Sequence, residues 1–192
     1  EPEKSLTISI YKNLKDSLIF SPFLMSVVTS LSIVESLENL KIPNVFIKWP
    51  NDILSCNKKI GGVLIENFFI RGKLFDSVIG IGLNINQDSF RNLNDASSLK
   101  IETGKYWKIK DILENLIIYL NKGLKKLEIT DKNNLIDLYE NKLWKFNQKA
   151  SFNSKGSIFG AKIIGVNFNG ELVLDVKGKE ITFNNQKVKM LY

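Results

Sequence analysis

Three short blocks decide the fold expected for this chain: Lys48-Trp49-Pro50-Asn51-Asp52, Lys58-Lys59-Ile60-Gly61-Gly62-Val63-Leu64-Ile65-Glu66 and Gly80-Ile81-Gly82-Leu83-Asn84-Ile85-Asn86. In each block an apolar strand pattern stops at polar or glycine residues. Carboxylate, amide and ammonium groups are therefore expected to collect at strand ends, where a small ligand can bind.

The segments around these blocks predict helices packed on a sheet. Apolar and polar residues alternate from Leu6 to Tyr11, which is typical of a half-buried strand. Ser21 and Pro22 offer an N-cap and a proline at the first helical position, and the apolar residues that follow recur at helical spacing up to Leu40. Further strands are expected at 45–49, 60–69 and 74–85, a polar loop at 86–105, and further helices at 109–127 and from Asp131.

Short strands are expected after Trp144. Asn169-Gly170 favours the type I′ turn of a two-residue hairpin, and Lys177-Gly178 predicts a similar reversal. About five short strands result, which is enough for a small closed barrel. The sequence therefore predicts two domains, residues 1–146 and residues 147–192.

The composition excludes several kinds of site. The single cysteine, Cys56, cannot form an internal disulfide, and the absence of histidine removes the commonest metal ligand and general base. Zinc sites and histidine-dependent triads are therefore excluded. Apolar runs are too short for a membrane span, so no membrane partner and a cytoplasmic location are expected.

The net charge of +7 favours acidic or phosphate-bearing partners without choosing between them. The 27 Lys and Arg residues are mostly scattered along the chain, which is typical of a solvated surface. Nucleic acid is not an expected partner, because no clustered basic segment or reading motif is visible.

In their order and spacing, the three blocks resemble the catalytic domain of biotin protein ligases, and the resemblance covers almost the whole chain. It implies an α+β fold, with a mixed sheet packed with helices of the class II synthetase-like type and a small SH3-like β-barrel. It also implies an enzyme that activates biotin with ATP as biotinyl-5′-AMP and transfers biotin to a lysine of a biotin carboxyl carrier protein. ATP and biotin would be the substrates and magnesium the activator, and no tightly bound cofactor is expected. Whether the protein forms a homodimer is left open.

The resemblance also assigns roles to residues. Lys59 would contact the biotin carboxylate and the adenylate linkage, and Asp52 and Asn84 would hold magnesium. The biotin and adenylate contacts would come from Lys48, Trp49, Asn51, Lys59, Gly61, Gly62, Val63, Leu64, Gly80, Gly82 and Asn84.

Ordinary structural interpretations stay open beside these roles. Lys59 fits a solvated turn before a strand, and the glycine pair after it fits a β-bulge. Asp52 fits a turn former after proline. Trp49 fits either the core or a wall beside a ligand, and Asn84 fits a strand-end hydrogen bond.

The chain departs from the family in one respect. A Gly-Arg-Gly loop and a Ser/Thr-rich biotin contact are expected ahead of the strand at Leu6, and the sequence contains neither. We therefore expect these residues to hold only half of the binding site, with upstream residues left out rather than activity lost. The alternatives are a non-catalytic module that binds biotin or the carrier protein, and a lipoate- or octanoyl-transferase-like protein.

Overall fold

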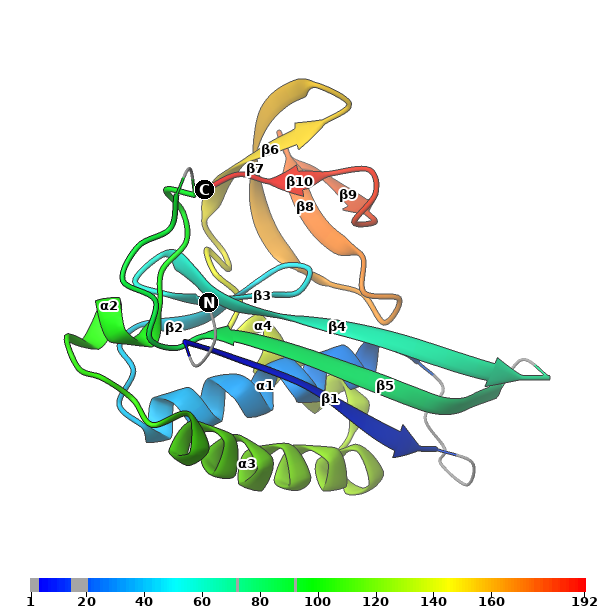
Figure 1. The fold of residues 1–192 in the computed structure, drawn as a ribbon. Coiled ribbons are helices and arrows are strands. Elements are labelled where there is room, and N and C mark those ends of the chain that lie inside the picture. Colours follow the sequence, from blue (N-terminus) through cyan, green and yellow to red (C-terminus); the bar gives the residue numbers. More distant parts are fainter. Residues whose placement is uncertain (1–3, 15–20, 72, 92) are drawn as a thin grey trace.

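A computed structural model describes residues 4–14, 21–71, 73–91 and 93–192. Two five-stranded sheets and four helices make up this part of the chain (Figure 1). Sheet A has the strand order β1 (Ser5–Asn13), β5 (Lys73–Asn84), β4 (Lys58–Ile70), β3 (Asp52–Ser55) and β2 (Val45–Lys48). Sheet B has the order β10 (Lys189–Met190), β6 (Lys149–Ser154), β7 (Ser157–Val166), β8 (Leu172–Val176) and β9 (Lys179–Phe183).

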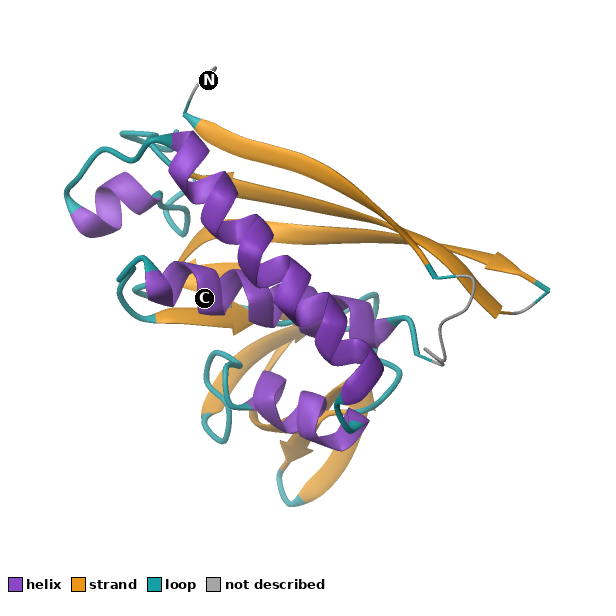
Figure 2. Cartoon of the chain, turned by 90° about the horizontal axis from the view of Figure 1, so that it is seen from below, coloured by secondary structure: helices purple, strands orange, loops and turns teal. Residues whose placement is uncertain are grey.

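The helices cover one face of sheet A, as Figure 2 shows from below. Helix α1 (Phe23–Asn39) and helix α3 (Ile109–Ile129) pack against each other beneath the strands, and α4 (Lys132–Glu140) packs on α1. The strand side chains that point to this layer are apolar and buried, for example Leu6, Ile79 and Ile81. This shared burial is the main source of stability in the fold.

The opposite face of sheet A lies open. Thr7, Ser9 and Tyr11 alternate with the buried side of β1, and Leu64 of β4 is 65% exposed. Figure 1 shows β1, β4 and β5 extending well beyond the helices. Sequence alternation with period 2 therefore separates a core face from an open face, as predicted for Leu6 to Tyr11.

The predicted α+β class is confirmed, and the pairing inside sheet A is more specific than predicted. Every strand pair of sheet A is antiparallel. Parallel pairing occurs in isolated bridges at its margin, Ile47 with Leu143 and Lys59 with Ala96. Among the described residues, these single bridges are therefore the only parallel pairings that make sheet A a mixed sheet.

Two elements were not predicted. Strand β3 is four residues long and pairs with both β2 and β4. Helix α2 (Leu99–Thr103) lies within the segment predicted as a loop, and the Ser98 hydroxyl caps it by accepting a hydrogen bond from the Ile101 amide. Both are too short to produce a periodic sequence pattern.

Local details also differ from expectation. The Ser21 hydroxyl does not cap α1 but donates to the Phe168 carbonyl at 2.6 Å. The type I′ turn occurs at Lys177-Gly178, where both residues have positive φ, whereas at the 169–170 turn only Gly170 does. Helical spacing predicts a buried Leu138 in α4, but Leu138 is 41% exposed and Ile136, two residues before it, is buried instead.

Sheet B curls into a small barrel-like layer beside sheet A (Figure 1). Within the described strands it is open, because β9 and β10 are its two edges. Several hydrogen bonds attach it to the rest of the chain: besides the bond from Ser21 to Phe168, the Trp49 indole donates to the Gly170 carbonyl at 2.9 Å, and the Val166 amide donates to the Glu140 carboxylate at 2.8 Å. None of the helices in the described ranges is long and apolar enough to cross a membrane.

Candidate functional site

The register of sheet A aligns the polar and glycine residues of the three sequence blocks. Thr7 of β1 lies opposite Gly82 of β5, Gly82 lies opposite Gly62 of β4, and Gly62 lies opposite Asp52 of β3. These four residues form one row across the open face. A hollow of about 360 Å³ lies over this row and the next, lined by Thr7, Ile8, Ser9, Asn51, Asp52, Lys59, Gly62, Val63, Leu64, Gly80, Ile81 and Gly82.

Asp52 is the centre of a charge cluster at one end of this hollow. Its Oδ1 is paired with the Lys59 ammonium, and its Oδ2 lies 3.9 Å from Lys48 Nζ. The Tyr192 hydroxyl donates to the same Oδ2 at 3.3 Å. One carboxylate thus faces two ammonium groups and a phenol, which makes the cluster positive overall and suited to an anionic ligand.

The two lysines of the cluster differ in access. The side chain of Lys59 is 44% exposed and lines the hollow, whereas Lys48 is only 5% exposed. Burial lowers the pKa of Lys48, and the charge of Asp52 partly opposes this shift. Lys59 can therefore contact a ligand directly, while Lys48 contributes charge from below the surface.

The backbone of Lys59 is fixed on both sides. Lys59 pairs with Leu54 of β3, its amide donates to the Asp95 carbonyl at 2.7 Å, and its carbonyl accepts from the Ser97 amide at 2.8 Å. Only the side chain of Lys59 is left free to adjust. The predicted interpretation as a solvated turn before a strand is therefore wrong, because Lys59 lies inside β4.

The glycines of the two strand blocks have different environments. A Cβ on Gly82 would meet nothing within 4 Å, and one on Gly62 would lie 3.7 Å from Asp52 Oδ1, so both face the hollow. A Cβ on Gly61 would instead lie 2.5 Å from the Gly82 carbonyl oxygen and from a Leu83 methyl group. Gly61 is thus required by packing inside the sheet. A β-bulge is present beside the glycine pair and not at it, because Gly62 and Gly61 pair with Asp52 and Ile53 while Ile60 is the extra residue.

Asn51, Val63 and Trp49 connect the site to its surroundings. The Asn51 amide donates to the Val63 carbonyl and the Val63 amide donates to the Asn51 carbonyl, both at 2.9 Å. Trp49 is buried, joined to the following proline by a cis peptide, and bonded to Gly170 of the second sheet. Of its two predicted positions, core and ligand wall, the structure favours the core.

The remaining predicted residues line the open face or its end. Gly80 and Leu64 pair with each other and form the next row of the hollow. Asn84 ends β5, and its amide donates to the Ser97 carbonyl at 3.0 Å, which is the strand-end hydrogen bond considered from sequence. Asn84 thereby holds the segment that fixes Lys59.

The described side chains around the hollow offer a small donor set for a metal ion. Within the described ranges no group of three or more Asp, Glu, Cys or His side chains lies together. Asp52 supplies one carboxylate to the hollow, whereas Asn84 does not line it and its Oδ1 accepts a hydrogen bond from Gln87 at 3.4 Å. One carboxylate does not suit a dedicated calcium or zinc cage, but magnesium is usually held by one or two carboxylates together with substrate phosphates.

A second hollow of about 320 Å³ lies between β4, the start of α1 and sheet B. It shares Asn51, Val63 and Leu64 with the first hollow. Among its described lining residues Glu171 is the only charged one, and asparagines, serines and apolar residues such as Phe23 and Ile65 make up most of the rest. The charge cluster lies at the first hollow, because Lys59 and Asp52 line it and Lys48 is close to Asp52 from below the surface.

Sequence reasoning missed Tyr192. Tyr192 follows the last strand of sheet B and reaches Asp52 across 140 positions of the sequence. No local pattern at the end of the chain signals such a contact. The stretch Ser97-Ser98-Leu99 resembles a family segment close to the nucleotide, but its backbone contact with Lys59 was not predicted.

Known proteins resemble this chain both in sequence and in structure. Residues 1–84 match the model of the Biotin/lipoate A/B protein ligase family. The chain is 24% identical over 172 residues to the bifunctional ligase/repressor BirA of Bacillus subtilis, covering 88% of this chain and 50% of that protein. It is 28% identical over 187 residues to the human biotin–protein ligase, covering 92% of this chain and 25% of that protein.

Among solved structures, the Aquifex aeolicus biotin protein ligase in complex with biotin and ATP superposes with a TM-score of 0.79 at 25% identity. This match covers 98% of the present chain and 78% of the Aquifex chain. The chain therefore spans half or less of the two curated relatives and most of the solved ligase. Residues 1–84 are therefore similar to the Biotin/lipoate A/B protein ligase family, and the fold of the chain is similar to that of the Aquifex biotin protein ligase.

Proposed function

We propose that this protein is an ATP-dependent biotin–protein ligase, which forms biotinyl-5′-AMP and transfers biotin to a lysine of a biotin carboxyl carrier protein. The observation that carries the proposal is the Lys59–Asp52–Lys48 cluster at the end of a glycine-lined hollow on the open face of sheet A. Further support comes from the fold, which is shared with a ligase that binds both biotin and ATP.

The chemistry demands such a cluster. A biotin carboxylate must attack the α-phosphate of ATP, and these two anions repel each other. Fixed ammonium groups reduce the repulsion and stabilise the charge that develops as pyrophosphate leaves. The protein must also hold the reacting oxygens in line, which a rigid sheet does well.

Each residue receives a role in this proposal. Lys59, with its fixed backbone and accessible ammonium, contacts the biotin carboxylate and then the adenylate linkage. Lys48 adds positive charge from below, and Asn51 lies beside the nucleotide. Gly62, Gly80 and Gly82 leave room for the ligand over the strands, and Leu64 supplies apolar contact. Val63, Gly61 and Trp49 support the site through the backbone and the core.

Magnesium belongs to the proposal as an activator of ATP. Asp52, helped by the Asn84 amide oxygen, would hold it together with substrate phosphates. The ion would neutralise part of the triphosphate charge.

The division of the chain is proposed as a catalytic domain of residues 1–146 and an SH3-like domain of residues 147–192. The change from helices to short antiparallel strands after α4 supports this boundary. The carrier protein is the expected macromolecular partner, and the cytoplasmic location and a homodimer stay predictions.

The test is pyrophosphate–ATP exchange by the natural full-length protein, with biotin, lipoate or octanoate as the acid. We expect exchange that requires both biotin and magnesium, followed by labelling of a purified carrier domain. Exchange driven better by lipoate or octanoate would favour the transferase-like alternative. Biotin binding by the folded protein without any exchange would favour the non-catalytic module.

A further inference from the structure

We propose that Tyr192 is a positioning residue of the site, through which sheet B covers Lys48 and orients Asp52. This inference rests on the proposed function for its kinetic consequences, but its structural content can be tested without biotin or ATP. It gives a residue that follows the last strand of the second sheet a direct part in the site, and the sequence did not single this residue out.

The contacts of Tyr192 converge on the charge cluster. Lys48 Nζ lies 4.0 Å from the centroid of the Tyr192 ring, and the Tyr192 hydroxyl donates to Asp52. An ammonium over an aromatic face gains electrostatic energy, more so where water is excluded. The ring thus acts as a lid on Lys48, which lies at the end of β2 and would otherwise face solvent on this side.

The phenol is suited to the Asp52 contact because it remains protonated. Burial and the charge of Asp52 both raise the pKa of the Tyr192 hydroxyl. It therefore stays a hydrogen-bond donor at neutral pH. Lys59 occupies the other carboxylate oxygen, so the orientation of Asp52 is fixed by groups from both sheets.

Tyr192 is held in place by sheet B and its linker. The Leu191 amide donates to the Ser151 carbonyl at 2.9 Å, and the preceding Val188 and Met190 are buried. The Tyr192 ring lies 5.8 Å from that of Trp144, whose indole donates to Asn57 at 2.7 Å. The ring is thus placed by fixed elements rather than by an unsupported tail.

The first test measures the reactivity of Lys48 toward a small acylating reagent, read by mass spectrometry of the full-length protein without ligands. At a pH of about 10 ordinary lysines are partly neutral, so access limits the reaction. Lys110, whose side chain is 82% exposed, serves as the internal standard. The variants are Tyr192→Leu, which removes the ring, and Tyr192→Phe, which keeps it.

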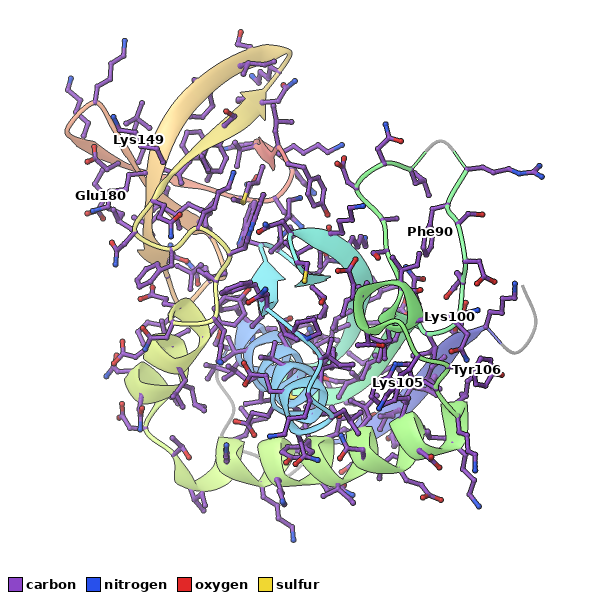
Figure 3. The ribbon with its side chains drawn as sticks, turned by 90° about the vertical axis from the view of Figure 1, so that its left-hand side faces the viewer. Phe90, Lys100, Lys105, Tyr106, Lys149 and Glu180 are labelled. Carbon is purple, nitrogen blue, oxygen red and sulfur yellow. The ribbon has the colours of Figure 1, made fainter. Side chains whose placement is uncertain are left out.

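We expect the Lys48 acylation rate, relative to that of Lys110, to be about fivefold or more higher in Tyr192→Leu than in wild type. In Tyr192→Phe the rate should stay within about twofold of wild type, because this variant retains the partly desolvated ring contact that Tyr192→Leu loses. The matched control is Tyr106→Leu. Tyr106 is 67% exposed, and Figure 3 places it between α2 and α3, far from Lys149 of sheet B. An unchanged Lys48 rate in folded Tyr192→Leu would overturn the inference. If that variant does not fold, Tyr192→Met takes its place with the same criteria.

The second test is kinetic and uses the biotin-dependent exchange assay. Tyr192→Leu should lower kcat by about tenfold, in the range of a desolvated cation–π contact, with a smaller change in KM for biotin. Tyr192→Phe, which keeps the ring over Lys48 but loses the hydroxyl contact with Asp52, should give a kcat between those of wild type and Tyr192→Leu, and Tyr106→Leu should change neither constant. Wild-type kcat in Tyr192→Leu together with increased Lys48 acylation would overturn the positioning role. Absence of exchange in the wild type would count against the proposed function and leave the acylation result standing.

Discussion

Adding a single methyl group to Gly61 or to Gly82 should have different effects: the first should disturb packing, and the second should disturb ligand binding. In Gly82→Ala the new methyl group enters the hollow and meets no atom within 4 Å. In Gly61→Ala it lies 2.5 Å from a backbone carbonyl oxygen of the adjacent strand, which cannot move without disturbing the sheet. The two substitutions are chemically identical and lie on adjacent, paired strands.

The expected magnitudes follow from these surroundings. Gly61→Ala should lower the free energy of unfolding by about 1–3 kcal/mol, the usual cost of overpacking. For a chain of this size that corresponds to a melting temperature lower by about 2–12 °C. Gly82→Ala should unfold at the wild-type temperature or slightly above it, because alanine reduces the entropy of the unfolded chain by about 0.4–1 kcal/mol.

Ligand binding should show the opposite order. The methyl group of Gly82→Ala occupies space over the strand row in which we place biotin, so the affinity for biotin should fall about tenfold or more, within the cost range of overpacking. Thermal unfolding and calorimetric titration with biotin measure the two effects. Equal melting temperatures for the two variants would refute the packing argument, and wild-type biotin affinity in Gly82→Ala would refute the placement of the ligand.

Three further outcomes are expected. Lys59→Ala should slow biotin-dependent exchange by about 10²–10³, the cost of a lost charge-stabilising donor, while Lys110→Ala leaves it unchanged; a folded Lys59→Ala with normal exchange would remove Lys59 from the mechanism. Because burial lowers the pKa of Lys48 in the folded state, the unfolded chain binds more protons between that lowered value and about 10.4. Urea titrations of wild type and Lys48→Met give the difference between their unfolding free energies. This difference, wild type minus variant, should become more positive as the pH rises across this window, and a constant difference would contradict the burial argument. Trp49→Phe removes the hydrogen bond to Gly170 and should cost about 0.5–1.5 kcal/mol by the same titrations, so an unchanged midpoint would mean that this bond does not help to attach sheet B.

The sequence predicted the long elements well because their burial is periodic. Helices α1 and α3 and strand β1 each repeat one pattern over nine or more residues, so local spacing is enough to identify them. Strand β3 was missed because its residues are nearly all buried over only four positions, which leaves no alternation to read.

The candidate site was predicted in part for a similar reason. Lys59 and Asp52 lie seven residues apart and meet through the β3–β4 pairing, so their proximity was implied by a local motif. The difference between Gly61 and Gly62 was available from strand alternation, because neighbouring residues point to opposite faces. The contribution of Tyr192 was not available, since it depends on how the second sheet docks on the first.

The alignment of Thr7, Gly82, Gly62 and Asp52 has a consequence for folding kinetics. The β3–β4 and β4–β5 hairpins join residues that are close in sequence. Strand β1 instead pairs with β5 far along the sequence, from Ser5 with Asn84 onward, and Asp52 meets Tyr192 across 140 positions. Contacts of such long range carry a high loop-closure entropy and slow the search for the native state. The hairpins that carry Lys59 can therefore form early, while the complete charge cluster forms only when both ends of the chain have docked.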